Sequence, residues 1–316
     1  MSINLSQIIS EFLSLPASEQ QIAAEAIREK NRKKNAGDYN DPRLNEELSR
    51  KAGMSSAFRA QIGEYARAIL VSAKTGQFLV DPEDYEIGHR LRTTGSYGDD
   101  ELARIKNLVA AGSNVLVIGA HVGTLAIPIA KTCGDVTAIE ANPNTFRLLE
   151  MNILLNDVQN CTAINLAAND NFEEISFIVN RVNSGGSKRK PLVDNFIYTY
   201  DNPAEIIVRA APLDDLLAGT PFEIIIMDIE GSEYFALRGM QNLLRNSKTL
   251  IVEFIPHHLQ NVSAISVDEL LGSIPGFRFL TVPSKGIKVP ENAFSFLLNN
   301  MYYHNISDDG IIFSRN

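Results

Sequence analysis

Residues 114–130 read NVLVIGAHVGTLAIPIA, and this stretch decides the fold of the chain. An apolar run at 114–118 predicts a buried strand that leads into Gly119, and Gly123 precedes a segment with the composition of a helix. Glycines at such a turn let the backbone bend tightly and approach a ligand, at which the helix N-terminus points. The stretch predicts either a cofactor site or a purely structural strand–turn–helix.

The residues around this turn indicate the kind of cofactor. Glu140 follows Gly119 by 21 positions, at the end of the next predicted strand, where an acid accepts hydrogen bonds from the ribose hydroxyls of an adenosine. A dinucleotide site would carry G-x-G-x-x-G, but the run from Gly119 to Gly123 has one glycine fewer. A pyrophosphate loses its close backbone approach there, so S-adenosylmethionine is favoured over NAD.

Short apolar runs alternate with helical segments on both sides of this stretch. Further strands are predicted at 136–139, 162–166, 174–179, 223–227 and 249–254, with helices at 125–131, 144–156 and 232–244. Such alternation predicts a mostly parallel α/β sheet with right-handed crossovers. The alternating tail after Phe277 is expected to add an antiparallel hairpin at one edge of the sheet.

Two segments stand apart from this pattern. Residues 1–75 predict an N-terminal helical extension, with helices over 1–30 and 44–74, which serves as a cap or a dimer contact, so a homodimer is possible. Residues 76–316 are expected to form the α/β domain. Residues 180–203 are long for a loop and hold Gly185, Gly186 and a basic cluster; a functional lid is favoured over a disordered insertion.

Composition restricts the partners. The chain has 316 residues and a formal net charge of −9, the opposite sign to that of a typical nucleic-acid binder. Cys133 and Cys161 are too few for a disulfide framework, and they predict reduced thiols in a cytoplasmic protein. Neither a signal peptide nor a membrane-spanning run is recognisable, so no membrane partner is expected.

Four motifs together resemble one family. VIGAHVG at 117–123, IEANPNTFRLLEMNILLND at 139–157, PLDDLL at 212–217 and MDIEGSEYFALRGM at 227–240 follow one another in the order of the FkbM methyltransferases. The resemblance spans about residues 76–256. It implies a Rossmann-like class I methyltransferase fold, with S-adenosylmethionine as the methyl donor and S-adenosylhomocysteine as the product.

The same resemblance implies which residues hold the cofactor. These are Gly119, His121, Gly123, Glu140, Asn142, Asn169, Asp170 and Asp228. Asn169 and Asp170 resemble the pair that meets the adenine amino group, although an Asx turn is the alternative. The family usually has an acid at Val117 and an asparagine at His121. The methionine ammonium group would therefore use backbone carbonyls or Asp228.

Polar residues at two strand ends predict the chemical site. Asp228 ends one strand, with Glu230 and Glu233 behind it, and Glu253 ends the next, followed by His257 and His258. Glu230 or Glu233 could instead satisfy a helix N-terminus. A sulfonium donor needs an aligned acceptor and a base; His257 is favoured as base over His258, with Asp228 as an orienting group. Glu253 would orient a histidine or share a metal; magnesium is possible, but no spacing demands it.

Three functions remain open on these grounds. The first is methylation of a hydroxyl on a small metabolite such as a sugar, polyketide or peptide, as the family resemblance implies. The second is methylation of a macromolecule, and the third is a non-catalytic domain that binds the cofactor or a partner. The sequence does not identify the acceptor.

Overall fold

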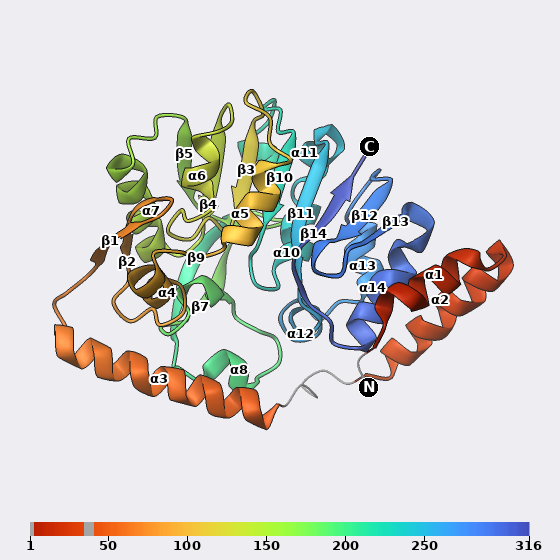
Figure 1. Cartoon of the computed structure of the whole chain (residues 1–316), viewed down its shortest axis with the longest axis horizontal. Helices are drawn as coiled ribbons and strands as arrows, with labels where there is room; N and C mark the ends of the chain where they lie inside the picture. The colour runs from red at the N-terminus through yellow and green to blue at the C-terminus, as the bar shows by residue number, and fades with distance from the viewer. Residues whose placement is uncertain (1–2, 35–40, 316) are drawn as a thin grey trace.

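The computed structural model describes residues 3–34 and 41–315, and an eight-stranded sheet forms its centre (Figure 1). The strand order is β13-β12-β14-β11-β10-β3-β4-β5. The parallel strands are β3 (Val115–Ile118), β4 (Val136–Glu140), β5 (Cys161–Asn165), β10 (Ile224–Met227) and β11 (Thr249–Phe254). The antiparallel strands are β12 (Phe279–Val282), β13 (Ile287–Pro290) and β14 (Asp308–Ser314). The mostly parallel sheet with an antiparallel C-terminal hairpin is thereby confirmed.

Helices cover both faces of this sheet, because its side chains alternate between two buried layers. On β3, Val115 and Val117 pack with α5 (Asp99–Lys106), α6 (Ala126–Ala130) and α7 (Pro143–Leu155). Leu116 and Ile118 belong to the opposite layer, which contains α10 (Glu233–Arg238), α11 (Gln241–Asn246), α13 (Val267–Gly272) and α14 (Phe294–Tyr303). The shorter helices are α8 (Phe196–Thr199), α9 (Leu213–Leu216), α12 (Pro256–His258) and the single turns at Ser184–Gly186, Leu259–Ser263, Pro283–Lys285 and Glu291–Ala293.

A second, four-stranded sheet carries the strand expected at 174–179. Its order is β6 (Ala167–Ala168), β9 (Ala204–Ala211), β7 (Glu173–Val179) and β8 (Lys188–Arg189). The series of central strands therefore does not include β7, which pairs with β9 in antiparallel register. Only a short turn separates β7 from β6, whereas a parallel crossover requires a dozen or more residues.

The N-terminal part differs from the expected pair of long helices. It contains α1 (Leu5–Ser14), α2 (Ala17–Arg32) and α3 (Pro42–Ile62), then a hairpin of β1 (Ile69–Ala73) and β2 (Gly76–Val80), and α4 (Ile87–Thr94). The prediction of a helix up to residue 74 was wrong for its last part. Gly63, with φ +83°, ends α3, and the following apolar residues alternate between buried Val71 and exposed Leu70, as strand residues do.

The N-terminal helices lie at two different places on the molecule (Figure 1). The α1–α2 pair packs on α14, where the Phe12 ring stacks on Phe296 with centroids 3.9 Å apart. Helix α3 instead runs below the carboxyl ends of the central strands, where Lys51 forms an ion pair with Glu86 at 2.8 Å. Only α3 is therefore placed near the ligand-binding edge of the sheet.

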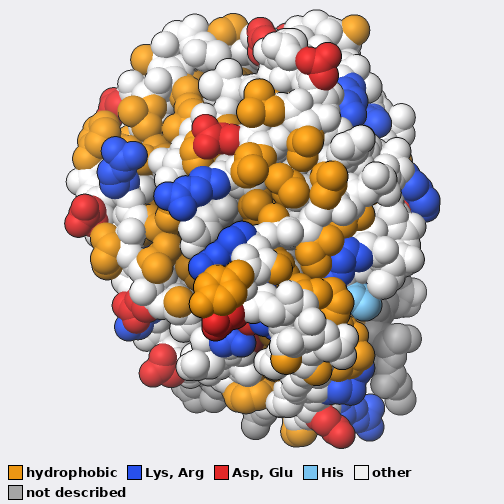
Figure 2. All heavy atoms as spheres, turned by 90° about the vertical axis from the view of Figure 1, so that its left-hand side faces the viewer, with side chains coloured by type: hydrophobic (Ala, Val, Ile, Leu, Met, Phe, Trp, Pro, Cys, Tyr) orange, Lys and Arg blue, Asp and Glu red, His pale blue; other side chains and the backbone are white. Residues whose placement is uncertain are grey.

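One face of the molecule carries apolar side chains between scattered charges (Figure 2). Helix α7 exposes Met151, Leu154 and Leu155, with Leu154 79% accessible. Surfaces of this composition are typical of protein–protein contacts. Within 3–34 and 41–315, none of the helices has the length and apolar character needed to cross a membrane.

Candidate functional site

The turn after β3 touches the end of β10. Gly119 has φ +87°, and a Cβ atom there would lie 1.7 Å from the carbonyl oxygen of Asp228. The Asp228 N–H donates to the Ile118 carbonyl at 3.0 Å, which fixes the two strand ends side by side. Only glycine permits this approach. The structure thus brings together Gly119 and Asp228, two of the residues singled out in the sequence.

Glu140 is buried at the end of β4 and fixes the glycine turn. Its Oε2 accepts the His121 N–H at 2.9 Å, and its Oε1 accepts the Asn142 N–H at 2.8 Å. Burial raises the pKa of Glu140 to about 7, despite these hydrogen bonds. Each carboxylate oxygen has two lone pairs, so both can accept one more hydrogen bond from a ligand.

Two cavities meet at this turn. The smaller has a volume of about 50 Å³ and is lined by Glu140, Ala168 and Arg189 among others. The larger has a volume of about 920 Å³ and extends below the strand ends to Leu48 and Lys51 of α3. Both are lined by Ile118, Gly119, His121, Gly185 and Asp228. The two cavities therefore adjoin at Gly119 and Asp228.

The larger cavity is acidic. Eight carboxylates and four basic side chains line it, and the acids are Glu86, Asp99, Asp100, Glu101, Asp228, Glu230, Glu253 and Asp309. Asp228 is exposed, but into the cavity, where protein atoms surround it; burial and the nearby Glu230 raise its pKa well above its usual value. Burial and Asp228 do the same to Glu253, which is within hydrogen-bonding reach of Asp228. This carboxylate pair retains protons at higher pH than ordinary acids do.

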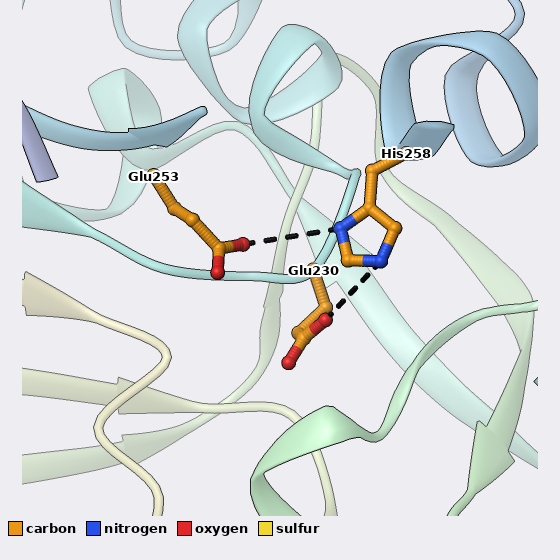
Figure 3. A group of neighbouring side chains, drawn as sticks. All are labelled: Glu230, Glu253 and His258. Carbon is orange, nitrogen blue, oxygen red and sulfur yellow. Dashed lines mark ion pairs between the residues drawn. The ribbon is translucent and has the colours of Figure 1, made fainter. Parts of the chain in front are cut away.

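The histidines favoured as bases are not among the residues that line either cavity. His258 is buried behind Glu230, with 3.4 Å between its Nε2 and Glu230 Oε2 (Figure 3). His257 Nδ1 lies 3.0 Å from the Tyr198 hydroxyl, and burial lowers the pKa of His257 to about 3. Glu230, Glu253 and His258 each offer a ligand atom within 4.8 Å of the others, so these three could hold a metal ion.

Several of the expected cofactor residues make contacts with other residues of the protein. Asn142 caps α7 by accepting the Asn144 N–H at 3.1 Å. Asn169 is fully buried, and its amide group contacts Glu173 at 2.8 Å and Arg189 at 2.5 Å. Asp170 forms an ion pair with Arg238 at 3.4 Å. None of these three lines a cavity, whereas Arg189 does.

Two other motif residues support the local backbone. Glu233 accepts the N–H groups of Ile229 and Gly231 at 3.1 and 3.2 Å, as expected for a residue that satisfies a helix start. Gly123 has φ +91°, and a Cβ atom there would lie 2.9 Å from the Leu149 side chain. Both residues keep the turns in shape without facing the cavities.

The sequence did not single out Ser184, Asp84 or Lys188. Ser184 Oγ lies 2.7 Å from His121 Nε2 and donates to Asp84 Oδ2 at 2.6 Å, so it ties the segment 180–203 to the glycine turn. Lys188 is buried and donates to Glu230 at 2.9 Å. The sequence feature that could have pointed to Ser184 and Lys188 is the pair of glycines beside a basic cluster in this segment. The same composition is also typical of a solvated loop.

The comparisons with known proteins agree with the class of this site. The model of the "Methyltransferase FkbM domain" matches residues 118–280, about half of the chain. A comparison with curated proteins found no match.

Three solved structures are similar to the chain at low identity. Trm5b from Pyrococcus abyssi is 16% identical over 60% of this chain and 42% of its own, with a TM-score of 0.34. The M. jannaschii tRNA m1G37 methyltransferase is 15% identical over 80% and 58%, with a TM-score of 0.40. M. jannaschii TYW2 in complex with AdoMet is 12% identical over 80% and 87%, with a TM-score of 0.41.

The chain spans about half the length of the first two of these structures. The family match covers the glycine turn, Glu140, the Asp228 motif and Glu253. The fold around these residues is the mostly parallel, Rossmann-like sheet of the methyltransferases. The chain therefore belongs to the FkbM methyltransferase family.

Proposed function

We propose that this protein transfers the methyl group of S-adenosylmethionine to a hydroxyl oxygen of a small metabolite. The observation that carries the proposal is the cavity of about 920 Å³ that adjoins Gly119 and contains the Asp228–Glu253 pair. Its size is within the range of sites for small ligands. Burial raises the pKa values of Asp228 and Glu253 well above their usual range, which makes their carboxylates stronger proton acceptors than ordinary acids.

The cofactor is proposed to extend across both cavities. Glu140 would accept hydrogen bonds from the ribose hydroxyls in the smaller cavity, and the sulfonium would lie near Gly119 and Asp228. The smaller cavity, at about 50 Å³, has room for only a few water molecules. Gly185 and Arg189 line it, so the segment 180–203 has to move before an adenosine can enter. This supports the lid expected from the sequence.

Methyl transfer then needs an aligned acceptor and a base. The acceptor oxygen forms a bond to the methyl carbon, the carbon–sulfur bond breaks, and its electron pair stays on the sulfur of S-adenosylhomocysteine. The acceptor proton leaves to a base. We propose the Asp228–Glu253 pair as that base, in preference to His257, because both carboxylates line the cavity. Glu230 would orient the acceptor.

The charge of the cavity bears on the acceptor class. Its eight carboxylates and the net charge of −9 disfavour a polyanionic substrate such as RNA. Leu48 and Lys51 of α3 border the cavity, so we propose that this part of the N-terminal extension acts as a cap. A capped, acidic cavity fits a small neutral or cationic acceptor.

The test is methyl transfer from isotopically labelled S-adenosylmethionine to an extract of small metabolites, with mass spectrometry of the products. We expect a labelled ether product whose formation falls about 10²–10⁴-fold in Asp228→Asn in single-turnover assays at saturating cofactor. Glu223→Gln, at the other end of β10, is the matched control. Labelling of RNA alone would refute the small-metabolite proposal. A normal rate in Asp228→Asn with a loss in His257→Gln would return the base to the histidine.

A further inference from the structure

Lys188 is a buried cation beside the proposed acceptor site. It is 6% exposed and comes from β8, within the segment 180–203. Its ammonium group lies 2.9 Å from Glu230 Oε2, 3.3 Å from His258 Nε2 and 5.2 Å from the centre of the Tyr198 ring. A buried charge persists only when it is paired and hydrogen-bonded, and these partners meet that requirement.

These contacts define which ring nitrogen of His258 carries the proton. An ammonium group has donors only, so His258 Nε2 must accept this hydrogen bond and Nδ1 carries the ring proton. Burial lowers the pKa of His258 well below its usual value, and the positive charge of Lys188 lowers it further. Both effects agree with a neutral ring. Its protonated Nδ1 faces Glu253 Oε2 at 3.9 Å. The ring thus lies between Glu230 and Glu253, and its Nδ1 makes no hydrogen bond to a described residue.

Two partners of Lys188 belong to the group of described residues that could bind a metal. Glu230, Glu253 and His258 bring their ligand atoms within 4.8 Å of one another (Figure 3). Two carboxylates and a neutral imidazole are a ligand set that divalent transition metals accept. The ammonium of Lys188 already contacts two of these three residues. A metal bound there would be repelled by a positive charge in direct contact with its ligands.

The backbone of Glu230 gives a second, independent observation. Its φ is +57°, a left-handed conformation that is strained for a non-glycine residue and persists only where the surroundings enforce it. The Lys188–Glu230 ion pair is such a constraint, with both side chains largely buried. It holds the Glu230 carboxylate at the wall of the larger cavity.

We propose that Lys188 is the resident cation of this site, which its ammonium group occupies in place of a divalent metal. Lys188 donates to Glu230 and contacts Nε2 of His258, so the carboxylate wall of the cavity is assembled without a metal. Because Lys188 belongs to the segment 180–203, this cation arrives and leaves with that segment.

The experiment uses Mn²⁺ as the probe and electron paramagnetic resonance to count free and bound ion. Lys188→Ala removes the charge and leaves space, whereas Lys188→Met removes the charge but fills the space. Lys190→Ala is the matched control, because it removes a lysine from the same segment that pairs at the surface with Glu205 at 2.8 Å. Binding of S-adenosylhomocysteine to each variant, measured by calorimetry, reports whether the fold is retained.

We expect one Mn²⁺ site in Lys188→Ala, more than about a hundredfold tighter than in the wild type, Lys188→Met or Lys190→Ala, because only Lys188→Ala both removes the repelling charge and leaves space for the ion. Adding Glu230→Gln should abolish it. A Glu230-dependent Mn²⁺ site in the wild type, or no site in Lys188→Ala, would overturn the proposal. If Lys188→Ala does not fold, Lys188→Asn replaces it, because asparagine keeps a hydrogen-bond donor for Glu230. The same Mn²⁺ binding results would then support or overturn the proposal. No arm needs a methyl acceptor, so a failure here leaves the proposed function standing.

Discussion

Replacement of Glu140 by glutamine should weaken the binding of S-adenosylhomocysteine and remove most of its pH dependence. In the wild type, both carboxylate oxygens accept a backbone N–H, from His121 at 2.9 Å and from Asn142 at 2.8 Å. Glutamine offers one acceptor oxygen and turns its NH₂ group toward the other donor. We therefore expect it to lose charge and one backbone contact while it keeps the shape of the side chain.

The expected magnitude follows from the burial of Glu140. Hydrogen bonds donated by ribose hydroxyls favour the ionised carboxylate, and burial raises its pKa to about 7 in the free protein. The affinity should therefore fall as the pH drops below 7, by about tenfold at pH 6 and about a hundredfold at pH 5. In Glu140→Gln, the loss of a charged acceptor costs roughly 1.5–3 kcal/mol, or about tenfold to a hundredfold, at neutral pH.

Titration calorimetry between pH 5 and 8 measures both effects. Glu223→Gln is the matched control, because Glu223 also accepts a backbone N–H, that of Asn114 at 2.8 Å, but lies at the opposite end of the sheet. It should bind as the wild type does. The reasoning is refuted if Glu140→Gln keeps the affinity and slope of the wild type. Tight NAD binding without any response to S-adenosylhomocysteine would refute the cofactor itself.

Four further predictions concern the fold and its movement. Gly119→Ala should abolish cofactor binding or folding, judged by calorimetry and thermal melts, because its Cβ atom would meet a carbonyl oxygen at 1.7 Å. Phe12→Ala should lower the free energy of unfolding by about 3–5 kcal/mol in denaturant melts, since its ring is 3% exposed. Burial raises the pKa of Glu233 to about 7 in the folded state, so the folded protein binds more protons and its stability should fall as pH rises from about 4.5 to 7. In Glu233→Gln, that part of the slope should be absent. Amides of residues 180–203 should exchange more slowly once S-adenosylhomocysteine is bound, and equal exchange in both states would contradict a lid.

The central sheet could be predicted because its strands are covered on both faces. Ile224 to Met227 form a continuous apolar run that fits no exposed segment, and their neighbours alternate with helices. The peripheral hairpin at Ile69–Ala73 could not be predicted, because its apolar residues also fit one face of a helix. The difference depends on pairing with β2, which is a tertiary fact rather than a local pattern.

The candidate site was predictable where backbone geometry controls it. Gly119 and Asp228 end adjacent parallel strands, so their meeting follows from the topology. Whether a side chain such as His257 or Glu253 points into the cavity depends on the turn after β11, which no spacing in the sequence describes. Lys188 lies in a run of basic residues that is usually solvated, and only the structure shows that one of the three is buried.

The stacking of Phe12 on Phe296 also has a consequence for biosynthesis. Helices α1 and α2 leave the ribosome long before α14, whose surface covers Ile9 and Phe12. At about 5–20 residues per second, the apolar side of this helical pair waits for some tens of seconds without its partner. The nascent chain therefore presents a hydrophobic hairpin to chaperones long before the methyltransferase sheet is complete.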